Sequence, residues 1–167
     1  ISLIAVPMVA SAFGSSSGLV AYASGWKTNS AIFPLIEALV SPAGSHVARW
    51  VSGLALGTIV CVVAWRARNA EGEATIRAAA LVVGSLFLLS PAQLPWYATW
   101  VAVFLPFVPA PAFLWLAVVM PLYYVAFHLI ARDQFATFAS IVVPLEWAPI
   151  LALLAIGAWR ALTVARG

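Results

Sequence analysis

Charged residues are scarce in this chain. Only 8% of its 167 residues are Asp, Glu, Lys or Arg, whereas 65% are hydrophobic, and the mean hydropathy is +1.06. A soluble domain usually has about a quarter charged residues, which cover the surface that faces water. No charged residue lies between Arg77 and Arg132, and this stretch has room for two membrane spans of about 20 residues each. The composition excludes an ordinary soluble domain and predicts an integral membrane protein.

Cysteine and the common catalytic motifs are also nearly missing. Cys61 is the only cysteine, so a disulfide within the chain and a thiolate metal cluster are excluded. His46 and His128 are the only histidines and give little support to a metal site, so none is predicted. There is no phosphate-binding loop, HExxH motif or Gly-rich dinucleotide turn. The net charge of +3 comes from scattered arginines, which excludes a nucleic-acid partner.

The start of the sequence does not resemble a signal peptide, because it has no basic segment ahead of its apolar residues. Residues 1–13 are apolar but too short to span a bilayer, so we expect the end of a helix that begins upstream. The GSSSG stretch at 14–18 should break that helix. Residues 19–42 mix aromatic, polar and small residues, which suits an amphipathic helix at an interface or along a cavity. We therefore expect 1–167 to be one transmembrane domain that lacks an N-terminal half.

The hydrophobic pattern predicts an all-α polytopic bundle of about five to six transmembrane helices. Gly53 and Gly57 form a small-xxx-small pattern in the clearest span, which favours close helix packing. The segment 95–107 lies between prolines and is about 18 Å long, which is less than the thickness of the hydrocarbon core. It forms either a short membrane span or a re-entrant hairpin. Pro121 should kink the span in which it lies. The predicted full spans are 46–66, 76–90, 112–131 and 138–164.

The arginines predict the orientation of the bundle. Arg66, Arg68 and Arg77 gather in the one hydrophilic loop, 66–77, and the positive-inside rule places that loop in the cytoplasm. The polar and aromatic segments then share the opposite face. Arg160 and Arg166 return to the cytoplasm only if the short segment 95–107 crosses, so the charge pattern favours a crossing.

Two aromatic-polar clusters are candidates for a binding site on this opposite face. In the first, Lys27 could neutralise a phosphate while Tyr22, Trp26 and Phe33 contact a sugar or an isoprenoid chain beside Asn29. The alternative is an aromatic belt with a snorkelling lysine, which is common in membrane proteins.

The second cluster is the turn SPAQLPWY. Here Gln93, Trp96 and Tyr97 either bind a ligand or anchor a proline turn at the interface. Ser90 and Leu94 precede prolines and should therefore be extended.

Glu146 is the most informative single charge, because an acid inside a membrane helix is costly and is usually paired or functional. We expect it about five residues into the last span from the outer side. Pairing with a buried donor such as Arg132 or Lys27 is the simpler prediction, and a role in catalysis is the alternative.

Three segments, in this order, resemble a known family. YASGWKTNSAIFPLIE, SPAQLPWYATWVAVFLPF and PLYYVAFHL with PLEWAPILALL are similar to the C-terminal half of bacterial GT-C-type glycosyltransferases of the polyprenyl-phosphate-sugar-dependent, mannosyltransferase-like kind. The resemblance implies a GT-C-like fold in the bacterial inner membrane. It also implies sugar transfer on the periplasmic face from a lipid-linked donor.

The resemblance also implies roles for particular residues. Trp26, Lys27 and Asn29 correspond to the aromatic-basic-Asn stretch of the family, and Glu146 corresponds to the acid of its E-aromatic-x-P motif. The family's SPxxHPWY turn has Leu94 in place of its His, so Gln93 would substitute. That turn is matched by Ser90, Pro91, Pro95, Trp96 and Tyr97.

The family's catalytic acid lies in its N-terminal half, so this chain should contain no catalytic residue. It would bind the polyprenyl-phosphate sugar donor and membrane lipids. Mg²⁺ or Mn²⁺ could bridge the phosphate in the full protein, with ligands from outside this chain. The alternative function is a non-catalytic accessory or structural subunit that packs against other membrane proteins. A transporter is a third class, but the sequence has no internal repeat to support it.

Overall fold

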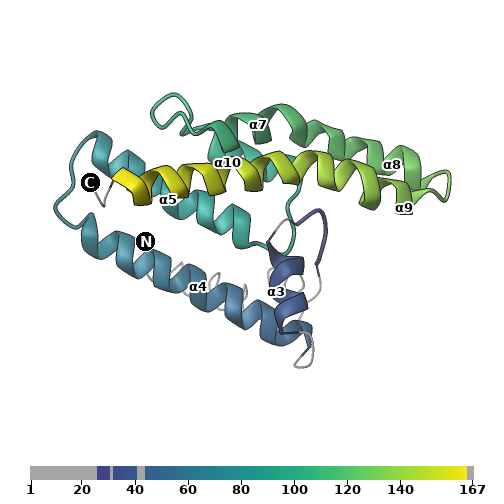
Figure 1. Cartoon of the computed structure of the whole chain (residues 1–167), viewed down its shortest axis with the longest axis horizontal. Helices are drawn as coiled ribbons and strands as arrows, with labels where there is room; N and C mark the ends of the chain where they lie inside the picture. The colour runs from purple at the N-terminus through teal and green to yellow at the C-terminus, as the bar shows by residue number, and fades with distance from the viewer. Residues whose placement is uncertain (1–25, 31, 41–43, 165–167) are drawn as a thin grey trace, which may run out of the picture.

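The computed structural model describes residues 26–30, 32–40 and 44–164, and the predicted features at 1–25, which include Tyr22, lie outside these ranges. The described part consists of helices joined by loops and turns, with one isolated parallel β-bridge between Thr28 and Ala92 and no strands. The helices run back and forth along one long axis (Figure 1). The all-α prediction is confirmed for the described residues.

The first long element is the helical hairpin formed by α4 (Ser45–Arg66) and α5 (Glu73–Leu89). The two helices pack against each other and are joined by residues 67–72. Gly44 and Gly72, at the starts of the two helices, have φ of 84° and 55°, which a residue without a side chain adopts readily. The predicted span 46–66 is confirmed, and the hydrophilic loop is shorter than the predicted 66–77 because helix continues into both of its ends.

The chain turns sharply where α5 ends. Ser90 and Leu94 are extended, with ψ of 137° and 150°, as expected for residues that precede a proline. A single 3-10 turn (Pro95–Tyr97) and α6 (Ala98–Ala102) follow. The chain then runs back toward the end where the α4–α5 loop lies (Figure 1).

A second long hairpin completes the bundle. Its first arm consists of α7 (Pro111–Val119), a 3-10 turn (Met120–Tyr124) and α8 (Val125–Ile130). The 3-10 turn contains Pro121, whose ring removes a backbone donor and disturbs the α-helix. The predicted irregularity at Pro121 is therefore present as a tightened turn.

The second arm begins earlier than predicted, at Phe135. It consists of α9 (Phe135–Thr137), a π-helical turn (Phe138–Val142) and α10 (Val143–Val164). The wide turn directly precedes Pro144, which has no N–H to continue the regular ladder. The C-terminal end of α10 lies at the same end of the bundle as the α4–α5 loop (Figure 1).

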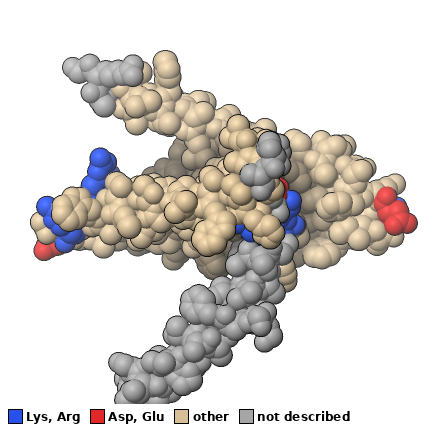
Figure 2. All heavy atoms as spheres, turned by 90° about the horizontal axis from the view of Figure 1, so that it is seen from below, with Lys and Arg blue, Asp and Glu red and all other residues tan. Residues whose placement is uncertain are grey.

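Three helical segments in the described part are long and apolar enough to cross a membrane: His46–Arg66, Pro111–Ile130 and Phe135–Thr163. The predicted number of five or six spans is not confirmed, since α5 has 17 residues and α6 has five. Charged side chains gather at the two tips and in one central band, and the intervening surface is uncharged (Figure 2). Only 11% of the first segment is buried within the chain, so most of it is left for lipid or another protein to cover.

The core lies where α5, α6, α7 and α10 meet. Phe87, Leu116, Trp147 and Ile150 are each at most 3% exposed there. Gly84 of α5 faces the Phe113 ring of α7 closely, since an added Cβ would lie 2.9 Å from that ring.

The expected close packing at Gly53 and Gly57 is wrong for the described residues. A Cβ added at either glycine would meet nothing within 4 Å. These two glycines lie on open stretches of α4, and the small-residue contact is made on α5 instead.

A long amphipathic helix over 19–42 is also absent from the described part of that segment. Residues 26–30 are not helical, and α3 covers only Phe33–Leu39. Pro34 fits the first turn of α3, where its missing N–H costs nothing. The stretch before α3 is therefore free to pair with the turn after α5.

Candidate functional site

The two predicted polar clusters meet through their backbones. The Thr28 N–H donates to the Pro91 carbonyl at 3.1 Å, and the Gln93 N–H donates to the Thr28 carbonyl at 3.0 Å. The Thr28 hydroxyl also shares a 3.1 Å hydrogen bond with the Tyr123 hydroxyl from the second hairpin. Residues from three distant parts of the sequence thus converge at this point.

Asn29 connects this junction to the last helix. Its Nδ2 donates to Glu146 Oε2 at 2.8 Å, and its Oδ1 accepts from Trp147 Nε1 at 3.3 Å. Asn29 has a φ of 45°, a left-handed conformation that asparagine tolerates better than most residues. Its side chain therefore satisfies two groups of α10 at once.

Glu146 is completely buried and lies deeper than predicted. The membrane-length segment starts at Phe135, so the carboxylate is eleven residues along it and not about five. The predicted pairing with Arg132 or Lys27 is wrong, because the donor is the Asn29 amide. Glu146 Oε1 has no hydrogen-bond partner among the described residues.

Gln93 is also fully buried, and its side chain ends α5. Its Nε2 donates to the carbonyls of Phe87, Leu88 and Ser90 at 2.7, 3.1 and 3.3 Å. These carbonyls lie at the C-terminal end of α5, where a helix runs out of N–H donors, and the Phe87 carbonyl also accepts a backbone bond from the Ser90 N–H at 3.3 Å. The amide therefore faces the helix terminus, and the shape of the turn depends on it.

Lys27 lies at the surface of the same junction. Its Nζ donates to both carboxylate oxygens of Glu37 on α3, at 2.9 and 2.8 Å. The lysine and glutamate side chains are 48% and 22% exposed. An exposed pair of this kind contributes little to stability and can exchange partners.

The aromatic residues of the turn, Trp96, Tyr97 and Trp100, form a ladder. Trp96 and Tyr97 meet edge to face with ring centroids 6.0 Å apart, and Tyr97 and Trp100 lie 4.6 Å apart. Trp26 and Trp96 are about half exposed. The arrangement offers flat, partly accessible rings near a cation.

A cavity of about 710 Å³ opens next to the ladder, between α4 and the end of α5. This volume is within the usual range for small-molecule sites. Its walls are mostly apolar and include Phe33 and Phe87. Phe87 also contacts Trp147, with ring centroids 6.2 Å apart, so this part of the cavity wall packs against α10. The other lining residues are Trp26, Arg49, Ser52, Gly53, Leu56, Leu86, Leu89, Ser90, Pro91, Ala92, Tyr97 and Trp100.

Arg49 is the cation of this cavity. Its Nη2 donates to the Trp26 carbonyl at 3.2 Å, and its guanidinium carbon lies 5.5 Å from the centroid of the Phe33 ring. Ser52, one turn further along α4, has a buried hydroxyl without a partner among the described residues. A mostly apolar cavity with one arginine and a few hydroxyl groups can bind an amphiphile that has an anionic head.

The predicted site residues therefore have different positions. Trp26 and Tyr97 line the cavity, whereas Asn29, Gln93 and Glu146 are buried in hydrogen bonds that hold the chain together. Sequence reasoning missed Arg49 and Ser52, although an arginine in the first turns of a membrane helix was an available signal. In the described part of the chain, no three His, Cys, Asp or Glu residues lie together as metal ligands.

Comparison with known proteins gives no relative. Neither the protein-family models, nor the curated proteins, nor the solved structures match this chain. The fold and the site define a helical chain with three membrane-length segments and an amphiphile-sized cavity.

Proposed function

We propose that this chain is the C-terminal membrane portion of a glycosyltransferase that takes its sugar from a polyprenyl-phosphate-linked donor on the periplasmic face of the bacterial inner membrane. The observation that carries the proposal is the convergence of three separate segments. The segments around Lys27, Ser90–Tyr97 and Glu146 are those that resemble GT-C enzymes, and direct hydrogen bonds link them.

The cavity beside this junction supports a lipid-linked donor. A polyprenyl chain needs an apolar channel, which the walls from α4 and α5 offer, and its phosphate needs a cation at the opening. Arg49 meets that requirement within the lining. Lys27 would join it only by leaving Glu37, which its exposure allows.

The aromatic ladder supports a sugar near the phosphate. Partly exposed Trp and Tyr rings stack on the apolar faces of sugars and of isoprene units. Tyr97 and Trp100 line the cavity, and Trp96 packs against Tyr97. Asn29, Gln93 and Glu146 act as positioning residues, because each fixes the backbone on which the lining stands. This chain contributes no catalytic acid, and any bridging Mg²⁺ or Mn²⁺ would take its ligands from outside it.

The test uses the full gene product, reconstituted in vesicles with a radiolabelled polyprenyl-phosphate sugar. Arg49→Gln should raise the KM for the donor about tenfold or more, since a charged hydrogen bond to the phosphate is lost. Lys27→Ala and Trp96→Ala should give smaller increases.

Arg160→Gln on α10 is the matched control, because it removes one exposed arginine that is not part of the cavity lining. Donor KM values that are equal in Arg49→Gln and Arg160→Gln would remove the proposed role of the cavity. Absence of transfer from every polyprenyl-phosphate sugar would contradict the enzyme assignment.

The second candidate is a non-catalytic accessory subunit. The hydrogen bonds of Asn29, Gln93 and Trp147 favour it, because these polar groups already bond to partners within the chain and are not directed at a ligand. It is also favoured by the apolar surface left open on α4, where Trp50, Leu54 and Trp65 are about 70% exposed. Stable co-purification with one other membrane protein, without donor binding, would support this function.

A further inference from the structure

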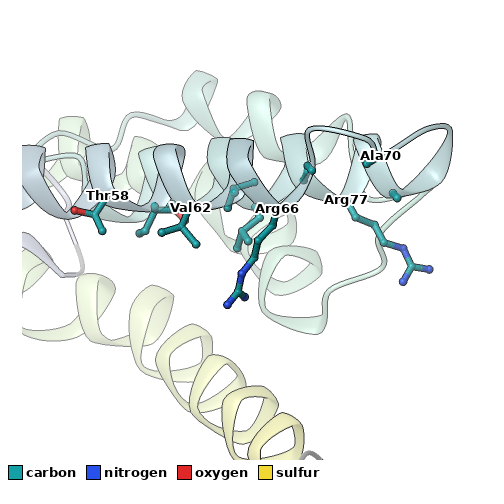
Figure 3. Close-up of a pocket in the computed structure, with 12 residues that line it drawn as sticks. Thr58, Val62, Arg66, Ala70 and Arg77 are labelled. Carbon is teal, nitrogen blue, oxygen red and sulfur yellow. The ribbon is translucent and has the colours of Figure 1, made fainter.

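A second cavity lies at the opposite end of the α4–α5 hairpin. It has a volume of about 560 Å³ and is lined by residues of α4, α5 and the loop between them. Figure 3 shows its walls, with Thr58 and Val62 along α4 and with Arg66, Ala70 and Arg77 toward the loop. This cavity is not used by the proposed function, and its two ends differ in chemistry.

Small side chains produce the cavity. Ala67, Ala70, Ala74 and Ala78 line it where the hairpin opens toward its loop. Methyl groups do not fill the space between two helices at this separation, so a groove is left between α4 and α5. The larger wall residues are apolar, namely Ile59, Val62, Val63 and Leu81. The hydroxyl of Thr58 donates to the Leu54 carbonyl of its own helix at 2.8 Å. Its hydrogen is therefore not available to a ligand in the groove.

Two arginines stand at the loop end of the groove. Figure 3 shows the side chains of Arg66 and Arg77 extending to the same side of the hairpin. Within the described part of the chain, the side chain of Arg66 makes no hydrogen bond or ion pair. Arg77 bonds through Nε and Nη2 to Glu73 Oε1 at 3.1 and 2.6 Å, as an exposed pair one turn apart. An exposed pair is weak, and a guanidinium has five donors, so Arg77 retains donors for an anion.

The direction of the groove fits a lipid. Thr58 and Arg66 are eight residues apart on one helix, so the apolar wall extends about 12 Å from the arginines toward the middle of the membrane-length segment. A soluble anion makes no favourable contact with such an apolar wall, whereas an acyl chain does. Basic pockets between membrane helices on the cytoplasmic side are known to hold the head groups of anionic lipids.

We propose that this groove binds an anionic phospholipid, with the phosphate diester between Arg66 and Arg77 and one acyl chain along the alanine-lined gap. The site is independent of the sugar-donor cavity, which lies at the other end of the same hairpin. Its lipid would brace the loop end of α4 and α5, where the two helices leave a space.

The test measures lipid retention by the purified full chain in a neutral detergent. After delipidation, the protein is mixed with micelles that contain dioleoyl phosphatidylglycerol or, separately, dioleoyl phosphatidylcholine, and bound lipid is counted by native mass spectrometry. We expect retention of the anionic phosphatidylglycerol only. The Arg66→Gln/Arg77→Gln variant should bind it about thirtyfold more weakly, since each cation near a lipid surface contributes roughly a fivefold effect.

Arg68→Gln is the matched control. Its guanidinium stacks on Trp65, at 4.7 Å from the ring centroid, and donates to the Trp65 carbonyl at 2.9 Å, outside the groove. The control should bind phosphatidylglycerol like the unaltered protein. Equal weakening in Arg68→Gln would overturn the proposal, because the effect would then come from the overall charge of the protein. Equal retention in the double variant would also overturn it, because neither arginine would then contribute to lipid binding.

Ala74→Phe provides a second variant that keeps both arginines. A phenyl ring at this position should occupy the gap and reduce lipid retention, while helix content measured by circular dichroism stays unchanged. Equal binding of phosphatidylcholine would contradict the proposal. Displacement of the lipid by about a 10-fold molar excess of inorganic phosphate would also contradict it. Displacement by phosphate would identify a soluble anion as the ligand.

Discussion

Asn29 Nδ2 donates a 2.8 Å hydrogen bond to Glu146 Oε2, and this bond joins residues that are 117 positions apart in the sequence. The same asparagine accepts a hydrogen bond from Trp147. It therefore attaches the non-helical segment before α3 to the last helix, and the backbone of Thr28 attaches it to the turn after α5. The side-chain link between this segment and α10 is made by the Asn29 amide.

Replacing this amide should destabilise the protein. Asn29→Ala removes the donor to a buried carboxylate and should lower the free energy of unfolding by about 1–3 kcal/mol. Asn29→Gly removes the same donor but suits the φ of 45° better than alanine, so it should be less harmful by roughly 1 kcal/mol. Thermal unfolding in detergent, followed by circular dichroism, measures both. An Asn29→Ala variant as stable as the unaltered protein would show that the junction does not depend on this bond.

Gln93 gives a second prediction about the same junction. Gln93→Met keeps the length of the side chain but leaves the carbonyls of Phe87 and Leu88 without this donor, at a cost of about 1–3 kcal/mol. The turn that carries Tyr97 should loosen as well. Limited proteolysis near 90–97 should therefore speed up in Gln93→Met, and unchanged cleavage and melting would be inconsistent with a role in ending α5.

The glycines of α4 and α5 give a matched pair. Gly84→Ala places a methyl group 2.9 Å from the Phe113 ring and should destabilise the protein by about 1–3 kcal/mol. Gly57→Ala meets nothing among the described residues and should be neutral or stabilising by up to about 1 kcal/mol, because alanine favours helix.

The double variant Gly84→Ala/Phe113→Leu tests the cause of the first effect. The smaller leucine should recover part of the loss. A Gly84→Ala change that is no worse than Gly57→Ala would contradict the close approach of α5 and α7.

The orientation can be tested with single cysteines. In a Cys61→Ser background, a cysteine at Asn69 should resist a membrane-impermeant maleimide in intact cells and react after permeabilisation. A cysteine at Asp133 should react in both cases, since it lies at the tip of the opposite hairpin. The reverse pattern would invert the topology predicted from Arg66, Arg68 and Arg77.

Sequence patterns predict the long elements of this protein well, for physical reasons. A run such as Trp50–Trp65 contains no charge, so its only stable form in lipid is a helix that satisfies its own backbone. The prolines 91, 95 and 121 act locally. The residues before Pro91 and Pro95 are extended as predicted, and the irregularity expected at Pro121 takes the form of a 3-10 turn. Local rules are sufficient for these features.

The long-range partners could not be predicted in this way. Nothing near Glu146 in the sequence indicates that its donor is Asn29, and a search for opposite charges points instead to Lys27 or Arg132. Lys27 bonds to Glu37, ten residues away, because α3 is short and turns its glutamate toward it. Arg49 belongs to the candidate cavity only because α5 ends beside α4. These relationships depend on the packing of elements, and a single sequence contains no direct signal of it.

Most of the proposed function depends on a polyprenyl-phosphate donor that binds in the cavity beside the junction. A photoactivatable polyprenyl-phosphate sugar, with its reactive group in the first isoprene units, tests it directly in native membranes. We expect adducts on peptides from residues 49–56 and 86–100, and we expect their yield to be reduced in Arg49→Gln and unchanged in Arg160→Gln. Adducts confined to the outer surfaces of α7 and α8, or unaffected by Arg49→Gln, would contradict it.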